Sequence, residues 1–354
     1  MRVGLLYGPG LGSCSGEILA QVEEADRVGL DSVLFEERRG GRGCPGPMVA
    51  AAAARTTAIR VGTADRVLAL EHPVHTAEDF AVVDVMSRGR VILGVSPGED
   101  PGALRAAGVE WEGREQRFRE AVDLVRAAWT QDSFQFVGEH VSFPLGAQGP
   151  PGWRREPFTT PYLEQWRRGQ VVPQHLPVLP KPVQMPHPPI LVAAREKATI
   201  EWAARRGLGL LCSSLDTEDE LGRALGWYAD ALAAAGRDRC EVDVAVAREV
   251  FLADDGATAR ELALPSLRRF LEAERAGARP ADDRAALDLD EADLLERCFL
   301  VGSPLEVLDR LKRLQANLGM THLVGRVHLP GRPHLDVVGC IRLMASAIQT
   351  RLVA

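Results

Sequence analysis

Apolar residues recur along the chain in two patterns, short continuous runs and longer stretches with helical spacing. Short β-branched runs bounded by polar residues are typical of strands that are buried on both faces of a parallel sheet. The pattern predicts such strands over residues 3–7, 31–37, 61–68, 91–95, 189–194, 208–214, 240–253 and 321–329.

A helical pattern follows each of these runs. The clearest spans 118–129, where Phe118, Val122, Val125 and Trp129 fall on one face at i, i+4 and i+7 spacing. Other helices are predicted over 47–58, 77–86, 199–207, 217–236 and 338–352, and after the capping box that begins at Ser303. A strand followed by a crossover helix pairs in parallel with the next strand. Eight such units predict an α/β fold, a single (β/α)8 TIM barrel over residues 1–354, with its site at the carboxyl ends of the strands.

Two segments interrupt the repeat, one between the fourth and fifth strands and one after the seventh. Residues 144–188 are too long and proline-rich for an ordinary connection, which predicts a lid or binding loop. A surface excursion without ligand contact is the alternative. Residues 272–296 form a charged insertion whose role the sequence does not indicate.

Composition narrows the class of partner and the compartment. The formal net charge of -7 gives no support for nucleic-acid binding. The six cysteines show no metal-binding spacing, so no metal is predicted, and scattered single cysteines favour a reducing cytoplasm. No stretch approaches the roughly 20 apolar residues of a membrane span, and the N-terminus has a strand pattern rather than that of a signal peptide.

Several motifs resemble those of one known family. They are VGTADRVLALEHPVHTAEDFAVVDVMSRGR (61–90), LGVSPG (93–98), PKPVQMPHPPILVAA (180–194) with TIEWAARRGLG after it, and VGSPLEVLDRL (301–311). Together they resemble the bacterial luciferase-like family of flavin-dependent monooxygenases.

The resemblance implies a two-component enzyme. Reduced FMN, supplied by a separate reductase, would bind at the carboxyl ends of the strands and react with O2 to oxygenate a small organic substrate. It also implies a homodimer, with the second and third helices as its seam, where the alanine-rich stretch 50–54 permits close approach of another helix. Two alternatives stay open: a deazaflavin-dependent oxidoreductase that transfers hydride, and a non-catalytic flavin-binding subunit.

The resemblance also implies which residues form the cofactor site. By position they are Ala64, Asp65, Ser96, Ala194, Arg195, Glu196, Lys197, Thr199 and Ser213. The bond between Ala64 and Asp65 matches a non-proline cis peptide under the flavin ring. Thr199 matches a phosphate-contacting threonine at a helix N-terminus, where unpaired N–H groups attract anions; capping of the helix is the alternative role.

Two positions depart from the family pattern. Pro97 replaces a phosphate-binding arginine, which makes Arg195, Lys197 and Arg114 candidate substitutes. Glu37 and Arg38 stand where a Glu-His-His motif carries the acid–base group. An arginine cannot accept a proton, so Arg38 is expected to hold an anionic substrate group. Glu37 is a candidate base if burial raises its pKa, and otherwise a partner of Arg38.

Overall fold

A computed structural model describes residues 1–8, 15–37, 45–144, 154–156, 171–173, 175–277 and 288–353. Arg38 lies outside the described residues, as do Trp153, Phe158, Tyr162 and Trp166, the aromatic residues of the predicted lid. Among the described helices, none combines the length and the hydropathy needed to cross a bilayer.

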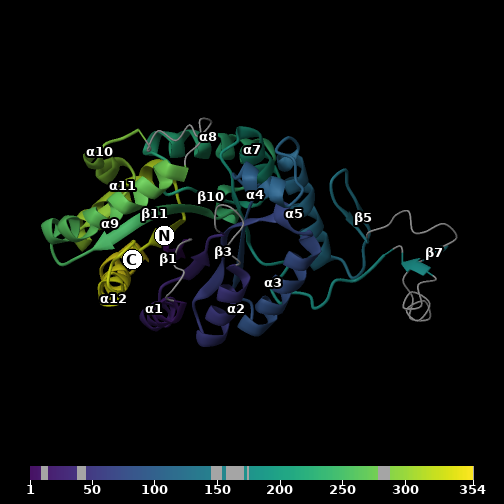
Figure 1. Ribbon diagram of the computed structural model, residues 1–354, viewed down its shortest axis with the longest axis horizontal. Helices are drawn as coiled ribbons and strands as arrows, with labels where there is room; N and C mark the ends of the chain where they lie inside the picture. The colour runs from purple at the N-terminus through teal and green to yellow at the C-terminus, as the bar shows by residue number, and fades with distance from the viewer. Residues whose placement is uncertain are drawn as a thin grey trace.

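Eight parallel strands form a closed barrel at the centre of the molecule, surrounded by helices (Figure 1). The strands are β1 (Arg2–Tyr7), β2 (Ser32–Phe35), β3 (Arg60–Val67), β4 (Val91–Ser96), β9 (Ile190–Ala193), β10 (Gly209–Cys212), β11 (Val244–Leu252) and β13 (His322–Arg326). Pairing of β10 with β11 and of β1 with β13 closes the ring. The predicted TIM barrel is therefore confirmed.

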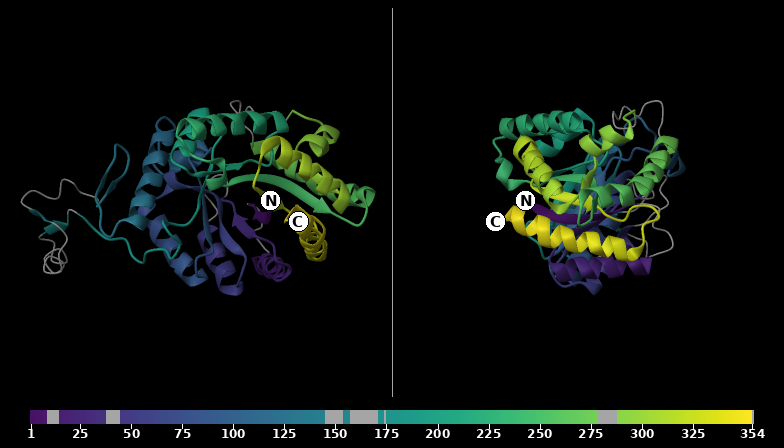
Figure 2. Two further views of the ribbon diagram at one scale, coloured as in Figure 1. Left: turned by 180° about the vertical axis from the view of Figure 1, so that it is seen from behind. Right: turned by 90° about the vertical axis from the view of Figure 1, so that its left-hand side faces the viewer.

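The helices follow the strands in the order that the sequence predicts. They are α1 (Ser15–Val28), α2 (Pro45–Arg55), α3 (Pro73–Ser87), α4 (Pro101–Ala106), α5 (Arg114–Thr130), α7 (Lys197–Arg205), α8 (Glu218–Ala234), α9 (Gly256–Gly277), α10 (Glu291–Arg297), α11 (Pro304–Leu318) and α12 (His334–Leu343). Both capping boxes are confirmed, Thr217 with Glu220 on α8 and Ser303 with Glu306 on α11. The chain closes on itself, because α12 packs beside α1 (Figure 2).

Several boundaries differ from the sequence prediction. Helix α3 begins at Pro73 rather than at 77, because the side chain of His72 accepts a hydrogen bond from the Val74 N–H and Pro73 suits the first helical position. The short strand β12 (Leu300–Gly302), which we did not predict, pairs with the end of β11 beyond the barrel. Helices α9 and α10 occupy much of the predicted charged insertion.

Four further short strands lie in the long connection between β4 and β9. They are β5 (Phe136–Val137), β6 (Ser142–Phe143), β7 (Arg154–Glu156) and β8 (Val171–Pro173). Strands β5 and β7 lie outside the barrel, beyond α5 (Figure 1). A lid role for residues 144–188 stays a prediction.

Two polar residues explain why the motif at the end of α3 is built as it is. The buried Asp84 carboxylate accepts hydrogen bonds from the backbone N–H groups of Val183 and Gln184, at 2.8 and 3.0 Å. Arg90 donates to the carbonyl oxygens of Ala53, Thr56 and Ile59, which are left unpaired where α2 ends. The motif thus ties α2, α3 and the chain entering β9 into one unit.

A β-bulge lies in β3, next to the predicted flavin floor. Thr63 pairs with Leu93 and Arg66 with Val95, so Ala64 and Asp65 stand opposite Gly94 alone. The cis bond expected between Ala64 and Asp65 is wrong, because the bond is not among the cis peptides of the structure. The extra residue of the bulge, rather than a cis peptide, reshapes this strand.

Gly94 is expected to be required by the bulge. A Cβ at this position would lie 2.2 Å from the Thr63 carbonyl oxygen and 2.4 Å from that of Ala64. Gly94→Ala should lower the free energy of unfolding by about 1–3 kcal/mol through overpacking, measured by urea denaturation. Gly226→Ala is the matched control, since Gly226 lies in α8 with open space around it and should gain about 0.5–1 kcal/mol. Equal stability of the Gly94→Ala variant and the wild type would contradict the account.

Candidate active site

The interior of the barrel is apolar below its mouth and charged at it. Alternate strand residues fill the interior, among them Leu6, Leu34, Ala64, Ile92, Leu191, Leu211, Ala245, Ala247 and Val324. Two residues further along β2 and β13, the same alternation turns Glu36 and Arg326 toward the barrel axis. Charged side chains therefore cover the core at the carboxyl end, which is where barrels of this kind place their sites.

Arg326 is the centre of the charged network at the mouth. One of its terminal nitrogens bonds both Glu36 oxygens, at 2.6 and 2.5 Å, and the other bonds Glu249 Oε1 at 2.9 Å. Ser214 also donates to Glu249 Oε1, at 2.8 Å. The guanidinium lies 5.3 Å from the ring centroid of Phe270 on α9. The network joins residues from β2, β11 and β13, so it fixes the mouth across the barrel.

Glu249 is the buried member of this network. Its side chain is 0% exposed, and its Oε2 has no hydrogen-bond partner among the described residues. Burial raises its pKa to about 7, although the charge of Arg326 acts in the opposite direction. Glu249 therefore exchanges a proton near neutral pH.

Asp65 and Ser96, two of the predicted floor residues, meet at the bulge. Asp65 Oδ1 accepts a hydrogen bond from the Glu37 backbone N–H at 2.9 Å, and Ser96 Oγ donates to the Asp65 carbonyl oxygen at 3.1 Å. Burial raises the pKa of Asp65 well above its ordinary value, and the negative charge of Glu36 adds to this rise. Ala64 lies in the barrel interior beside them. The structure thus brings Ala64, Asp65 and Ser96 together.

Glu37, the predicted catalytic carboxylate, also lies at this floor. Its Oε2 accepts a hydrogen bond from the Val67 backbone N–H at 2.7 Å. Burial raises its pKa, as its role as a base would need. Its pairing with Arg38 lies outside the described residues, so the catalytic assignment of both residues stays a prediction.

A second cluster lies where β9 leads into α7. Glu196 is the N-cap residue of α7, and its side chain makes no capping hydrogen bond, so ligands can reach the first N–H groups of the helix. Arg195 lies 3.5 Å from Asp216 and 3.4 Å from Glu220. Arg114, at the start of α5, lies 3.3 Å from Glu115 and 3.6 Å from Glu196.

These cations fit the phosphate of a flavin. Their distances to carboxylates exceed the roughly 2.7–2.9 Å of a tight charge-assisted hydrogen bond, so the ion pairs are loose. A phosphate group at the uncapped N-terminus of α7 would satisfy backbone N–H groups and gain a guanidinium on each side. The cluster also explains how the site tolerates Pro97 in place of an arginine.

Thr199 takes neither of its two expected roles in this structure. Its side chain is 0% exposed. Its hydroxyl donates to Glu115 and accepts a hydrogen bond from Arg119 at 2.9 Å, so it joins α7 to α5. It does not cap α7, where Glu196 is the N-cap. A phosphate contact by Thr199 would require these bonds to change.

The remaining predicted cofactor residues lie around the same end of the barrel. Ala194 follows β9 and is half-buried. Lys197 is exposed and lies 3.7 Å from Glu201 and 5.7 Å from the Trp227 ring centroid, so it faces along α7 and toward α8. Ser213 follows β10, and its N–H donates to Asp216 at 2.9 Å. Ser213 thus holds in place a carboxylate that pairs with Arg195.

Sequence reasoning missed Glu36, Glu249, Ser214 and Arg326. A signal was available for two of them, because Glu249 interrupts the apolar run of β11 and Arg326 ends that of β13. Charged residues at the carboxyl end of a barrel strand, in phase with interior positions, indicate a site. Nothing in the sequence indicates that Glu36, Glu249 and Arg326 contact one another.

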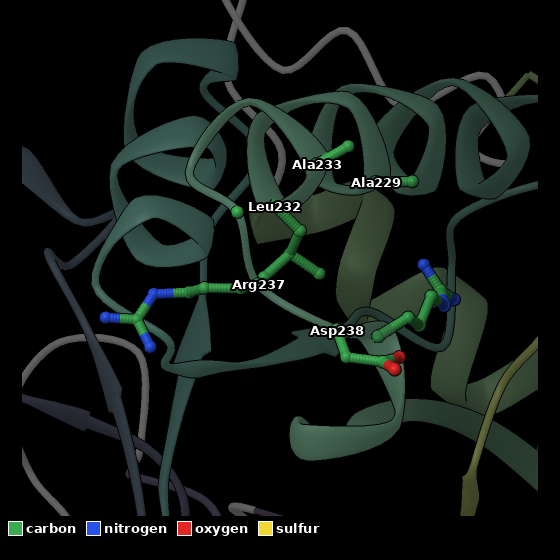
Figure 3. A pocket seen from close by; sticks show the side chains of 7 residues that line it. Ala229, Leu232, Ala233, Arg237 and Asp238 are labelled. Atoms are coloured by element: carbon green, nitrogen blue, oxygen red, sulfur yellow. The ribbon is translucent and has the colours of Figure 1, made fainter.

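Two other features of the described surface carry no comparable chemistry. A hollow of about 460 Å³ lies between the end of α8 and the turn before β11, at the opposite end of the barrel (Figure 3). Arg237 and Arg239 beside it donate to backbone carbonyl groups. The side chains of Glu120, Glu139 and His140 approach one another closely enough for a metal ion. However, backbone N–H groups of this loop already occupy the Glu120 carboxylate.

Comparison with known proteins gives one family across the chain. The model of luciferase-like monooxygenases matches residues 9–322. An F420-dependent glucose-6-phosphate dehydrogenase of Amycolatopsis mediterranei is 26% identical over 236 residues, covering 64% of this chain and 59% of the relative. The chain thus spans less than two thirds of that relative.

Two longer matches are to oxygenases. The oxygenase component of a flavin-dependent trigonelline monooxygenase from Acinetobacter baylyi is 23% identical over 319 residues, covering 85% of this chain and 80% of the relative. The crystal structure of the monooxygenase RslO1 from Streptomyces bottropensis has a TM-score of 0.82 and 26% identity, and the match covers 99% of this chain and 100% of that one.

Proposed function

Because the chain belongs to the luciferase-like monooxygenase family, we propose that it is the oxygenase component of a two-component enzyme that uses reduced FMN and O2 to oxygenate a small organic substrate. The likeness to the monooxygenase RslO1, which extends over both whole chains, carries this proposal. A separate flavin reductase as partner is proposed from the Acinetobacter relative, whose name describes an oxygenase component. Four described cysteines are free, which supports placing the reaction in the reducing cytoplasm.

The residues of the chain divide the work between two clusters. Arg195 and Arg114 hold the phosphate at the N-terminus of α7. Ala64, Asp65 and Ser96 form the floor on which the ring lies. Reduced FMN, when bound, supplies the electrons that activate O2. The apolar core below Glu36 and Arg326 keeps water from reaching the ring from beneath.

Binding of reduced FMN tests this proposal. Arg195→Ala should weaken anaerobic binding of reduced FMN, measured by fluorescence titration, on the order of tenfold or more, because one charge-assisted hydrogen bond to phosphate is lost. Arg205→Ala is the matched control: Arg205 lies at the other end of α7, is 52% exposed and pairs with Glu201. If both variants bind as the wild type does, or the wild type does not bind, the assignment of the phosphate site is wrong.

A deazaflavin-dependent hydride transfer is the second candidate, favoured by the Amycolatopsis relative. Parallel titrations separate the two, since tight binding of the deazaflavin without binding of reduced FMN would reverse our preference. A non-catalytic flavin-binding subunit is the third. Oxygen uptake coupled to turnover by the purified chain, with reduced FMN and candidate substrates, would exclude it.

We also propose a homodimer whose seam includes α3. Val82, Val85 and Met86 on this helix are 42%, 43% and 56% exposed, and Val183 beside them is 52% exposed. Met86→Lys should shift the sedimentation coefficient from that of a dimer toward that of a monomer, because burying a lysine at an apolar seam costs free energy. Lys at Leu335, which is exposed on α12, is the control. A wild type that sediments as a monomer would contradict the proposal.

A further inference from the structure

The Asp65 carboxyl group has one oxygen held by the protein and one directed to no protein partner. Its Oδ1 accepts a hydrogen bond from the Glu37 backbone N–H at 2.9 Å. Its Oδ2 makes no hydrogen bond to the described residues, and it is not among their sealed, unpaired atoms. Oδ2 therefore faces the accessible space at the mouth. The bulge of β3 creates this position, because it inserts Asp65 as an extra residue opposite Gly94.

Charged neighbours on three sides act on this carboxyl group. Glu36 and Glu37 follow β2 and Glu99 follows β4, and the negative charge of each disfavours ionisation of Asp65. On β3 itself, Arg66 is committed to Glu71. The resulting rise in the pKa of Asp65, with burial as its largest cause, means that the carboxyl group keeps its proton at neutral pH.

Glu36 exerts its effect from a fixed position. Arg326 binds both of its oxygens, and the same guanidinium is anchored on the far side by Glu249. Glu249 cannot itself touch a ligand, since its side chain is 0% exposed. Glu37 is less suited to donate a proton to a ligand, because its Oε2 is engaged by the Val67 N–H. Among these carboxyl groups, Asp65 combines a retained proton with a free oxygen.

We propose that Asp65 is a catalytic proton donor at the barrel mouth, and that Glu36 and Arg326 are positioning residues that keep it protonated. This assignment rests on the proposed function, because it places substrate at the same mouth. In the step, the O–H bond at Asp65 Oδ2 breaks and its proton bonds to a substrate oxygen or nitrogen that has gained an electron pair. The Asp65 carboxylate that remains is stabilised by the Glu37 N–H and regains a proton from water.

The titration of Asp65 in the protein without cofactor tests the first half of the proposal. Carbon-13 NMR of aspartate-labelled protein should show a carboxyl group that titrates above neutral pH, and Asp65→Asn should remove this signal. Glu36→Gln should move the titration to lower pH, because a negative charge is lost. Glu78→Gln, which changes an exposed residue on α3, should leave it in place. An Asp65 that titrates near the ordinary value of about 4 would overturn the proposal.

The pH dependence of turnover tests the second half. The wild-type rate should fall as pH rises through the pKa of Asp65, since only the protonated group can donate. Asp65→Asn should abolish this limb and lower kcat by about 10²–10⁴-fold, and Asp65→Glu should restore part of both. Wild-type turnover by Asp65→Asn would overturn the proposal even if Asp65 holds its proton. If reduced FMN fails to bind, turnover is measured with the reduced deazaflavin, and the NMR result stands independently of the cofactor.

Discussion

Arg326→Met should lower the free energy of unfolding by about 3–5 kcal/mol, the cost of removing one partner from a buried ion pair. The loss arises because Glu36 and Glu249 would then face each other at the barrel mouth without the guanidinium that joins them. Methionine keeps much of the side-chain volume, so the effect reports on charge rather than on a cavity. Urea denaturation at neutral pH measures it.

Arg342→Met is the matched control for this prediction. Arg342 pairs with Glu24 on the surface, where its side chain is 60% exposed, and such pairs contribute about 0–1 kcal/mol. Replacing Glu249 by methionine in the Arg326→Met background should restore part of the stability, because the uncompensated carboxylate is removed. A loss below about 1 kcal/mol for Arg326→Met would show that the network does not stabilise the mouth.

Glu249→Gln should become more stable relative to the wild type as pH rises. In the folded protein the pKa of Glu249 is raised from 4.5 to about 7, so the folded state holds a proton that the unfolded chain releases in this window. The stabilising contribution of this proton is fully present below pH 4.5 and is lost as pH approaches 7. For a buried group, the difference amounts to about 3 kcal/mol.

The measurement compares free energies of unfolding for the two proteins at several pH values across this window. Effects of groups that titrate alike in both proteins cancel in the difference. Glu261→Gln, which changes an exposed residue on α9, should show no such trend. A difference between Glu249→Gln and wild type that does not vary with pH would mean that Glu249 is ionised throughout.

The repeat of strand and helix was readable from sequence because it depends on local patterns. Apolar runs such as that of β4, and capping boxes such as Thr217 with Glu220, act over a few residues and were found where predicted. The bulge at Ala64 and Asp65 was not readable, since it depends on pairing with Gly94 in another strand. The expected cis bond failed for the same reason, because it was carried over by position and not from the contacts of this strand.

The candidate site shows the same division. Ala64, Asp65 and Ser96 could be named from motifs on neighbouring strands, and the structure places them together. The Glu36–Arg326–Glu249 network joins residues that are 290 and 77 positions apart in the chain, so no local pattern reveals it. The loose ion pairs of Arg195 and Arg114 likewise depend on how α5 and α7 pack.

A structure of the protein crystallised with FMN tests the central claim most directly. The account predicts the phosphate at the N-terminus of α7 between Arg195 and Arg114, and the ring over Ala64, Asp65 and Ser96. Arg195→Ala crystals treated in the same way serve as the control and should show weaker density for the phosphate. Flavin bound elsewhere, for example in the hollow beside Arg237, or a mouth that stays free of flavin at saturating concentration, would contradict the account.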